Sequence, residues 1–340
     1  MEGVGPVEQA VNFDPDPSVK IGHATNSEAL TGCTVVIFKD GAVGGVDVRG
    51  SATGSREIEL LRPMQRVGQV HGLLLTGGSA FGLDAAGGVM AWLEERKIGF
   101  KNAAGFTIPI VPAAVLFDLG IGNYRVRPDK AMGYEACCNA KSGYVEEGNV
   151  GAGTGATVCK ILNKDYRVKS GLGAWWEDLG NGLTVSAVVA VNALGDILDE
   201  SGRLMVGPRD RKTGQIYSTM SVWKKKASDL KMFGDYSIGI NTTLAVVVTS
   251  ASLTKAQANK VAQMANTGLA RCIEPAHTEY DGDITFALAT GKVSADASLI
   301  GAVAARVLET AVRRAIRAAW SVDGIPAYRD ICKENERRQR

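Results

Sequence analysis

The sequence predicts an α/β fold built as a four-layer αββα sandwich, in which helices cover both outer faces of two packed sheets. The first observation is that short apolar runs typical of buried strands occur both early and late in the chain, at residues 33–38, 72–75, 244–248 and 284–289. The second is that segments with helical spacing lie between and after these runs. A chain of 340 residues with 45% hydrophobic content can bury a core of this size, and we expect a single domain over residues 1–340.

The composition excludes several classes of protein. The formal net charge is +2, from 38 basic and 36 acidic residues, which gives no general attraction to nucleic acids or acidic membranes. Six cysteines without a Cys-x-x-Cys pair and three scattered histidines form no pattern typical of a zinc site, so we expect reduced thiols, no metal and no cofactor. The first residues do not read as a signal peptide and no apolar run is long enough to span a bilayer, so the expected location is the cytoplasm.

The N-terminal half is expected to contain a strand that leads directly into a helix. Residues 73–76 form the end of a strand, two glycines follow, and Ser79 is interpreted as the N-cap of a helix that reaches about Glu95. Ser79 is not the nucleophile of a serine hydrolase, because that motif requires glycine where Phe81 stands. Other elements expected here are separate strands at residues 33–38 and 42–48 and a helix near residues 131–140.

A glycine-rich segment resembles a nucleotide-binding loop. Residues 151–155 read Gly-Ala-Gly-Thr-Gly and partly match the dinucleotide-binding fingerprint, which leaves a nucleotide-dependent oxidoreductase as an alternative. The fingerprint normally follows an apolar strand, whereas residues 143–149 are charged and begin with glycine. We therefore favour a tight loop that opens onto a short helix.

The C-terminal half shows the clearest periodic segments. Residues 184–191 predict a strand that ends at Asn192. Residues 199–238 have no sustained period, and such a long irregular stretch is usually functional or mobile. A capping box at residues 254–257 begins a helix that runs to about Cys272. A further strand and a long helix are expected at residues 284–289 and 298–320.

The junction of Asn241 and Thr242 places a hydroxyl at the mouth of the buried strand 244–248. A threonine hydroxyl is a weak nucleophile until a base removes its proton, and a chain cut just before Thr242 would supply its own α-amino group as that base. The reference pKa of such an amine is about 7.7–8.0, so much of it accepts a proton near neutral pH. We interpret the junction as an autocatalytic cleavage site that yields fragments 1–241 and 242–340. The alternative is a turn followed by a core strand.

Five motifs in order resemble those of one family of hydrolases. They are Leu-Thr-Gly-Gly-Ser-Ala-Phe-Gly-Leu-Asp-Ala-Ala at residues 75–86, Val-Pro-Ala-Ala-Val-Leu-Phe-Asp-Leu at 111–119, Asn-Val-Gly-Ala-Gly-Thr-Gly-Ala-Thr at 149–157, Gly-Ile-Asn-Thr-Thr at 239–243 and Asp-Gly-Asp at 281–283. Together they resemble the P1 peptidase family, which comprises D-aminopeptidases, β-aminopeptidases and nylon-oligomer hydrolases. The resemblance extends from about residue 21 to residue 320 and implies an N-terminal-nucleophile-hydrolase-like sandwich that cuts its own chain.

The resemblance also implies roles for individual residues. Thr242 corresponds to the nucleophile and Asn241 to the end of the large fragment. Lys160 stands at a catalytic-lysine position, where a cation would lower the pKa of nearby hydroxyl or amino groups. Asn192 matches an asparagine whose side-chain amide donates to the oxyanion, a contact worth about 3–4 kcal/mol.

Two aspartates and one missing tyrosine complete the expected site. Asp281 and Asp283 are two residues apart, so in an extended chain they face the same way, suited to holding the ammonium or hydroxyl of the nucleophile. Phe117 lies where relatives often carry a tyrosine that assists the oxyanion. The replacements we consider for that hydroxyl are Tyr124 and Tyr134.

The resemblance implies an amide hydrolase that needs no cofactor. Threonine after asparagine and the paired aspartates are similar to the nylon-oligomer branch, so the expected substrates are linear amides such as aminohexanoate oligomers. The alternative is an aminopeptidase that acts on short peptides or β-amino acid peptides. The resemblance further implies a homo-oligomer, a tetramer of processed pairs, with no nucleic-acid or membrane partner.

Overall fold

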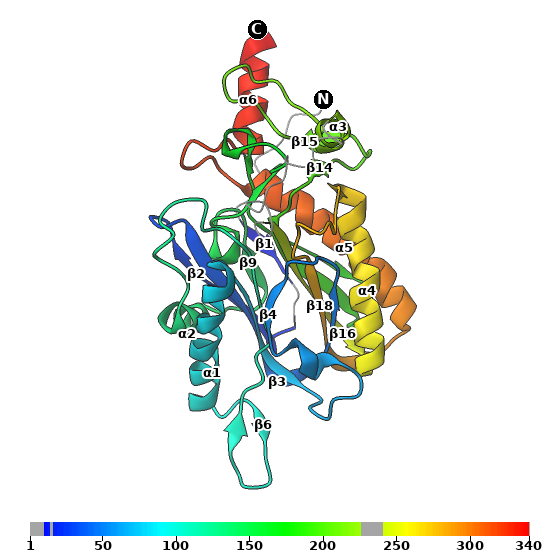
Figure 1. Ribbon diagram of the computed structural model, residues 1–340. Helices are drawn as coiled ribbons and strands as arrows, with labels where there is room; N and C mark the ends of the chain where they lie inside the picture. Colours follow the sequence, from blue (N-terminus) through cyan, green and yellow to red (C-terminus); the bar gives the residue numbers. More distant parts are fainter. Residues whose placement is uncertain (1–9, 14–15, 226–240, 340) are drawn as a thin grey trace.

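The computed structural model describes residues 10–13, 16–225 and 241–339. Helices α1 (Ala85–Glu95) and α2 (Lys130–Cys138) cover one sheet, and helices α4 (Lys255–Cys272) and α5 (Ala297–Ala318) cover the other (Figure 1). Separate apolar cores fill the space under each helix pair and the space between the sheets. The predicted αββα sandwich is therefore confirmed.

The strands of the sandwich are β2 (Val19–Asn26), β3 (Thr31–Val48), β4 (Gly54–Arg56), β5 (Val70–Thr76), β8 (Ala113–Val115), β12 (Leu172–Asp178), β13 (Thr184–Asn192), β16 (Thr242–Ser252) and β18 (Ile284–Ser294). Their order is β12-β13-β16-β18-β3-β5-β8-β4, with β2 also paired to β3. Smaller strands are β1 (Ala10–Asn12), β6 (Phe100–Lys101), β7 (Thr107–Ile108), β9 (Tyr144–Glu146), β10 (Thr157–Val158), β11 (Val168–Lys169), β14 (Asp196–Leu198), β15 (Leu204–Val206) and β17 (Ile273–Glu274). The other helices are α3 (Thr219–Lys225), α6 (Tyr328–Gln339) and the 3-10 turns η1 (Ile58–Leu61), η2 (Ser79–Asp84), η3 (Gly151–Gly153) and η4 (Lys164–Tyr166).

Strand β3 belongs to both sheets. Its first half pairs with β2 and β5, and its second half pairs with β18. The register with β5 shifts between Ile37 and Ala42, and Gly41 in this interval adopts a φ of +77°, which glycine tolerates without strain. The two separate strands predicted at residues 33–38 and 42–48 are thus one strand that passes from one sheet to the other.

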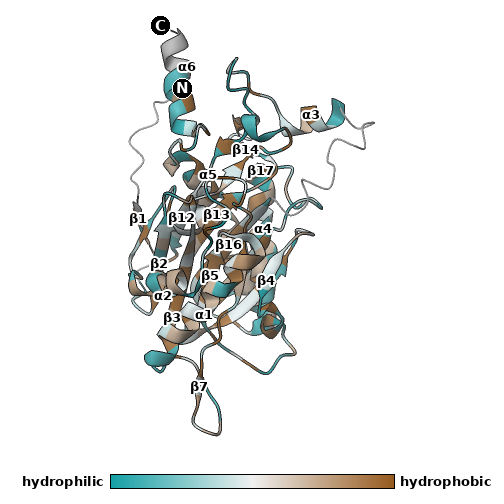
Figure 2. Ribbon diagram, turned by 60° about the vertical axis from the view of Figure 1, so that its left-hand side comes forward, coloured by the Kyte–Doolittle hydropathy of each residue, from teal (hydrophilic) through white to brown (hydrophobic). Residues whose placement is uncertain are grey.

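Alternation along β16 explains why this strand is apolar on both faces. Leu244, Val246 and Val248 lie in the core between the sheets, whereas Ala245 and Val247 lie in the core under α4 and α5. The central strands are accordingly the most hydrophobic part of the molecule in Figure 2, and the polar residues lie toward the periphery. The predicted burial of residues 244–248 on both faces is confirmed.

The helix after β5 begins later than the sequence predicts. Ser79 does not cap it: the residue has a φ of +53° and opens the 3-10 turn η2, and α1 starts only at Ala85. The cause is a set of hydrogen bonds that hold the turn against the chain after β8. The N–H of Gly78 donates to Asp118 Oδ1 at 2.7 Å, and the N–H of Ser79 donates to the Leu116 carbonyl at 3.0 Å.

Other predictions for the C-terminal half hold where the structure describes them. Thr254 and Gln257 form the capping box that begins α4, and α5 covers most of the long helix predicted at residues 298–320. The irregular stretch contains β15 and α3, and its residues 226–238 lie outside the described part of the chain. No helix within the described ranges is long and apolar enough to span a membrane.

Adjacent glycines in α1 give a matched test of the helix packing. A Cβ on Gly88 would lie 1.8 Å from the Lys130 carbonyl oxygen of α2, so we expect Gly88→Ala to lower the free energy of unfolding by about 1–3 kcal/mol or more. A Cβ on Gly87 would meet only the flexible Lys130 side chain, at 3.1 Å, so Gly87→Ala should be neutral or stabilising by up to ~1 kcal/mol. Urea unfolding measures both, and equal effects would contradict the packing described here.

Candidate active site

Strands β13 and β16 place Asn192 and Thr242 side by side. The antiparallel register opposes Asn192 to Thr242 and Ala190 to Leu244. Because side chains alternate along a strand, the two polar residues point the same way as Ala190 and Leu244, which lie in the core between the sheets. Asn192 and Thr242 therefore lie at the end of that core, and their exposed fractions are only 0% and 2%.

The peptide bond between Asn241 and Thr242 is held from both sides. Thr242 Oγ1 donates a hydrogen bond of 2.5 Å to the carbonyl oxygen of Asn241. The backbone N–H of Gly282 donates to the same oxygen at 2.8 Å. The Asn241 side chain donates to the Tyr280 carbonyl at 3.2 Å. The hydroxyl of the predicted nucleophile thus lies against the carbonyl group of the predicted cleavage site.

Lys160 orients the side chain of Asn192. Its Nζ donates to Asn192 Oδ1 at 2.5 Å and to the Asn192 backbone carbonyl at 3.0 Å, and the Thr157 N–H also donates to Oδ1, at 3.1 Å. The amide nitrogen of Asn192 is therefore turned the other way and donates to the Phe117 carbonyl at 3.2 Å. Burial and the positive charge of Arg167 lower the pKa of Lys160 well below its usual range.

Asp283 binds the residue after the predicted nucleophile. Its Oδ1 accepts from the Thr243 N–H at 2.7 Å, and its Oδ2 accepts from the His277 N–H at 3.1 Å and lies 2.9 Å from His277 Nδ1. Burial opposes protonation of His277, but the hydrogen bond and the charge of Asp283 outweigh it, and the pKa of His277 is raised. Asp283 is buried and His277 is half-buried, and the two side chains pair directly beside the start of β16.

Asp281 is held by a different set of donors. Its carboxylate accepts from the Leu194 N–H at 3.2 Å and from the Thr278 hydroxyl at 2.5 Å. Burial and the neighbouring charge of Asp283 raise the pKa of Asp281 to about 6. Within the described residues neither aspartate hydrogen-bonds to Thr242 in the uncut chain, so the expected direct contact with the nucleophile is absent there.

The expected replacements for the oxyanion tyrosine are engaged elsewhere. The hydroxyl of Tyr134 donates to Glu95 at 2.7 Å in the outer helix layer. Tyr124 is 55% exposed, and its hydroxyl accepts from Arg125 at 3.3 Å. At the position of the tyrosine itself, Phe117 contributes its backbone carbonyl, the acceptor for the Asn192 amide.

Sequence reasoning missed two polar residues near the site, the half-buried His277 and the buried Asp118. Asp118 accepts from the Thr31 hydroxyl and from the Gly78 N–H, both at 2.7 Å, and burial raises its pKa. Its signal was a carboxylate directly after an apolar run, the same placement that singled out Asn192. His277 was considered only as a metal ligand, although it lies six residues before Asp283 on the chain, within reach of a turn.

The glycine-rich segment forms a packing turn. The Gly151 N–H donates to Thr25 Oγ1 at 2.8 Å, and the Ala152 N–H donates to Thr34 Oγ1 at 3.1 Å, so amides that a phosphate would need are already used. After η3 the chain enters strand β10 instead of the predicted short helix. The arrangement does not support the nucleotide-dependent oxidoreductase. Within the described residues, no group of three His, Cys, Asp or Glu side chains could hold a metal ion.

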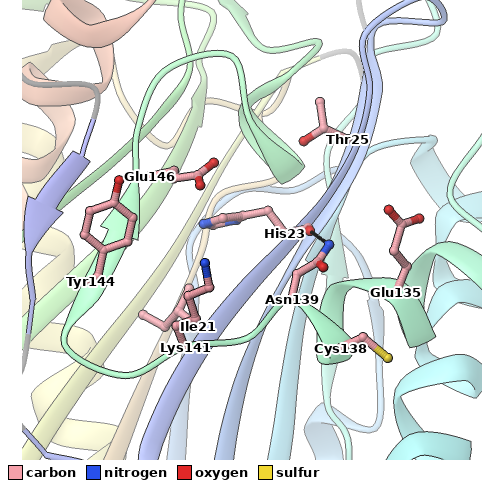
Figure 3. Close-up of a pocket in the computed structure, with 9 residues that line it drawn as sticks. All are labelled: Ile21, His23, Thr25, Glu135, Cys138, Asn139, Lys141, Tyr144 and Glu146. Carbon is pink, nitrogen blue, oxygen red and sulfur yellow. Dashed lines mark hydrogen bonds between the residues drawn. The ribbon is translucent and has the colours of Figure 1, made fainter.

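A polar pocket of about 440 Å³ lies beside β2, α2 and β9 (Figure 3). Its lining residues are Ile21, His23, Thr25, Glu135, Cys138, Asn139, Lys141, Tyr144 and Glu146. Thr242 and the other candidate residues are not among them. The candidate nucleophile is buried and does not line this pocket.

The raised pKa of Asp281 predicts a pH-dependent stability. Because its pKa in the folded chain, about 6, exceeds its usual value of 3.8, the proton-linked stabilisation is full below about pH 4 and is lost as the pH rises through 6. In Asp281→Asn this dependence is absent, so the wild type should lose roughly 1–3 kcal/mol relative to the variant between about pH 4 and pH 7. Thermal unfolding across this range measures the loss when both proteins also carry Thr242→Ala, which keeps each as one uncut chain, and a constant difference would contradict it.

Known proteins resemble this chain over nearly its whole length. The chain matches peptidase family S58 over residues 17–328. It is 40% identical to an uncharacterized aminopeptidase of Mycobacterium leprae, over 93% of this chain and 89% of that protein. It is 30% identical to a 6-aminohexanoate-oligomer endohydrolase of Kocuria sp., over 91% of this chain and 86% of that protein.

Solved structures share the architecture at low sequence identity. The β-aminopeptidase of Burkholderia sp. aligns with a TM-score of 0.69 at 21% identity, covering 95% of this chain and 94% of that one. The L-aminopeptidase D-Ala-esterase/amidase of Ochrobactrum anthropi, a variant of the Ntn-hydrolase fold, aligns with a TM-score of 0.65 at 17% identity, covering 96% and 94%. The fold and the family expected from the five motifs are both confirmed: the chain belongs to peptidase family S58 and is a hydrolase of that family.

Proposed function

We propose that the protein is an aminopeptidase that activates itself by cutting the bond between Asn241 and Thr242. The observation that carries this proposal is the 2.5 Å contact between Thr242 Oγ1 and the Asn241 carbonyl oxygen. It puts a hydroxyl beside the carbonyl carbon that an N→O acyl shift would attack. Hydrolysis of the resulting ester would leave fragments 1–241 and 242–340 within one domain.

Cutting the chain converts Thr242 into a nucleophile with its own base. In the uncut chain its nitrogen is an amide and does not accept a proton. In the cut chain it is an α-amine with a reference pKa of about 7.7–8.0, able to take the hydroxyl proton while Oγ1 attacks a substrate carbonyl. Water then releases the acyl group from the enzyme.

The surrounding residues support separate roles in turnover. Lys160 fixes the orientation of Asn192, whose amide nitrogen is the proposed donor to the substrate oxyanion. Asp283 binds the Thr243 N–H, so its carboxylate lies next to the position of the new N-terminus. Asp281 bridges to Asn241 in the uncut chain and would keep this end of the site ordered until the bond is cut.

Burial of the nucleophile favours activation by cutting. Asn241 is 0% exposed and Thr242 is 2% exposed, so the hydroxyl is buried in the uncut chain. Once the bond is broken, the end at Asn241 is free to withdraw from Thr242. The same event would then create the base and open the site.

We favour peptides with a free N-terminus as substrates, with nylon oligomers as the second candidate. Relatives named as aminopeptidases match at 39% or 40% identity, and relatives named as 6-aminohexanoate-oligomer endohydrolases match at 30% or 31%. Hydrolysis of nylon oligomers is still supported by the threonine nucleophile and the paired aspartates, which are similar to the nylon-oligomer branch. We also propose that the processed pairs assemble as a homo-oligomer, as the motif resemblance implies.

Replacing Thr242 tests self-cleavage directly. Thr242→Ala removes the proposed nucleophile, so this variant should remain one full-length chain without amidase activity. The matched control is Thr243→Val, because the Thr243 hydroxyl is buried and has no hydrogen-bond partner within the described chain. The control should be cut like the wild type. Intact mass spectrometry and N-terminal sequencing measure the outcome, and two fragments from Thr242→Ala would refute the assignment.

Substrate preference separates the two candidate activities. The cut enzyme should hydrolyse amino-acid p-nitroanilides with a kcat/KM about tenfold or more above that for 6-aminohexanoate oligomers, because a site suited to one substrate class discriminates by at least ~1.4 kcal/mol. N-acetylated p-nitroanilides serve as the control for a free N-terminus and should not be cleaved. Faster hydrolysis of the oligomers would establish the second candidate instead.

A further inference from the structure

We propose that the backbone N–H of Gly282 is the oxyanion donor for cleavage of the bond between Asn241 and Thr242. This inference rests on the proposed self-cleavage and assigns it a second catalytic group. Asn192 was expected to stabilise an oxyanion, yet its amide nitrogen donates to Phe117. The Asn241 carbonyl oxygen instead accepts from Gly282, at 2.8 Å.

The parallel register of β16 and β18 brings Gly282 to this oxygen. Leu244 lies opposite Ile284, and the pairing extends back to a bridge between Asn241 and Asp281. The N–H that follows Asp281 therefore points at the carbonyl of Asn241. In the uncut chain this N–H already lies 2.8 Å from the carbonyl oxygen that would become the oxyanion.

The donor meets the charge that the reaction creates. As Oγ1 of Thr242 bonds to the Asn241 carbon, the carbonyl electron pair moves onto the oxygen, which becomes the oxyanion. When this electron pair moves back to re-form the carbonyl double bond, the carbon–nitrogen bond breaks. The hydroxyl proton ends on the departing Thr242 nitrogen. Water then cleaves the ester into the Asn241 carboxylate and the free hydroxyl. The Gly282 N–H faces the charged oxygen and needs no rearrangement.

A short loop after β3 holds the donating peptide in place. The Ala52 N–H donates at 2.9 Å to the Asp281 carbonyl, which belongs to the same peptide unit as the Gly282 N–H. This bond polarises the peptide toward the Asn241 oxygen. On the other side of Gly282, the Thr53 hydroxyl lies 3.1 Å from the Gly282 carbonyl and 3.3 Å from the Gly50 carbonyl, and it can donate to either oxygen. The two peptide units that flank Gly282 are thus both held before the reaction begins.

Glycine is needed at position 282 because of the space around it. A Cβ there would lie 2.6 Å from Thr242 Oγ1 and 2.7 Å from the Ala52 carbonyl oxygen. Any side chain would push the nucleophile or the loop away. A substitution of Gly282 would therefore change both the packing and the chemistry, so the test must remove the N–H alone.

Replacement of Gly282 by glycolic acid, introduced through a suppressor tRNA during cell-free synthesis, exchanges the N–H for an ester oxygen. We expect this chain to cut itself about 100- to 1000-fold more slowly than the wild type, the loss typical of one oxyanion donor. The same exchange at Gly68, which is exposed and has open space around it, is the matched control and should cut at the wild-type rate. Denaturing gels over time give the rates.

The outcomes separate this inference from the proposed function. Wild-type cutting by the ester at position 282 would overturn the role of Gly282 while self-cleavage stands. A wild type and a Gly68 ester that both stay uncut would overturn self-cleavage itself, and the inference with it. Matching circular dichroism and thermal melts of the two esters, both made with Thr242→Ala so that neither chain is cut, confirm that slow cutting at position 282 does not arise from misfolding.

Thr53 provides a second measurement with ordinary side chains. Thr53→Val removes the hydroxyl that donates to the Gly282 carbonyl, so we expect cutting to slow by about fivefold, the rate equivalent of one hydrogen bond. Thr53→Ser keeps the hydroxyl and should restore the wild-type rate. Equal rates for the two variants would remove Thr53 as a positioning residue and contradict the fixed geometry of the donor.

Discussion

The parallel pairing of β16 with β18 is the constraint on which the candidate site depends. Both neighbours of this pair, β13 and β3, run antiparallel to it. Because two parallel strands begin at the same edge of a sheet, the residues just ahead of them are neighbours, and Asn241 bridges Asp281. Helix α4, of 18 residues, makes the crossover that a parallel pair requires. A tight hairpin in its place would have sent residues 281–283 to the far edge.

The tightly packed cores around this edge determine its electrostatics. Lys160 and Asp281 carry opposite charges when ionised, yet burial shifts both toward neutrality, lowering the pKa of the lysine and raising that of the aspartate. His277 behaves differently. The hydrogen bond and the charge of Asp283 outweigh burial there, so the pKa of His277 is raised and its charged form is favoured.

The elements that followed from the sequence are those specified locally. The apolar run 244–248, the capping box of α4 and the end of β13 at Asn192 were all predictable, because each depends on neighbouring residues. The predictions that failed concern hydrogen bonds between residues that lie far apart in the sequence. Ser79 is pulled out of its capping role by bonds to the chain after β8, and the contact of Asp283 with the Thr243 N–H depends on strand register. The sequence alone does not specify which residues of two paired strands lie opposite each other.

The sheet order has a consequence for the stability of a cut protein. Strands β16 and β18 come from residues after 241, and both lie between β13 and β3, which come from residues before it. The two products of cutting would therefore be interleaved within one hydrogen-bonded layer, with no surface along which they could part. Folding would be unimolecular before the cut, whereas recovery after denaturation would require two chains to meet and thread. Such an enzyme persists through a slow unfolding rate, and loss of its fold becomes practically irreversible.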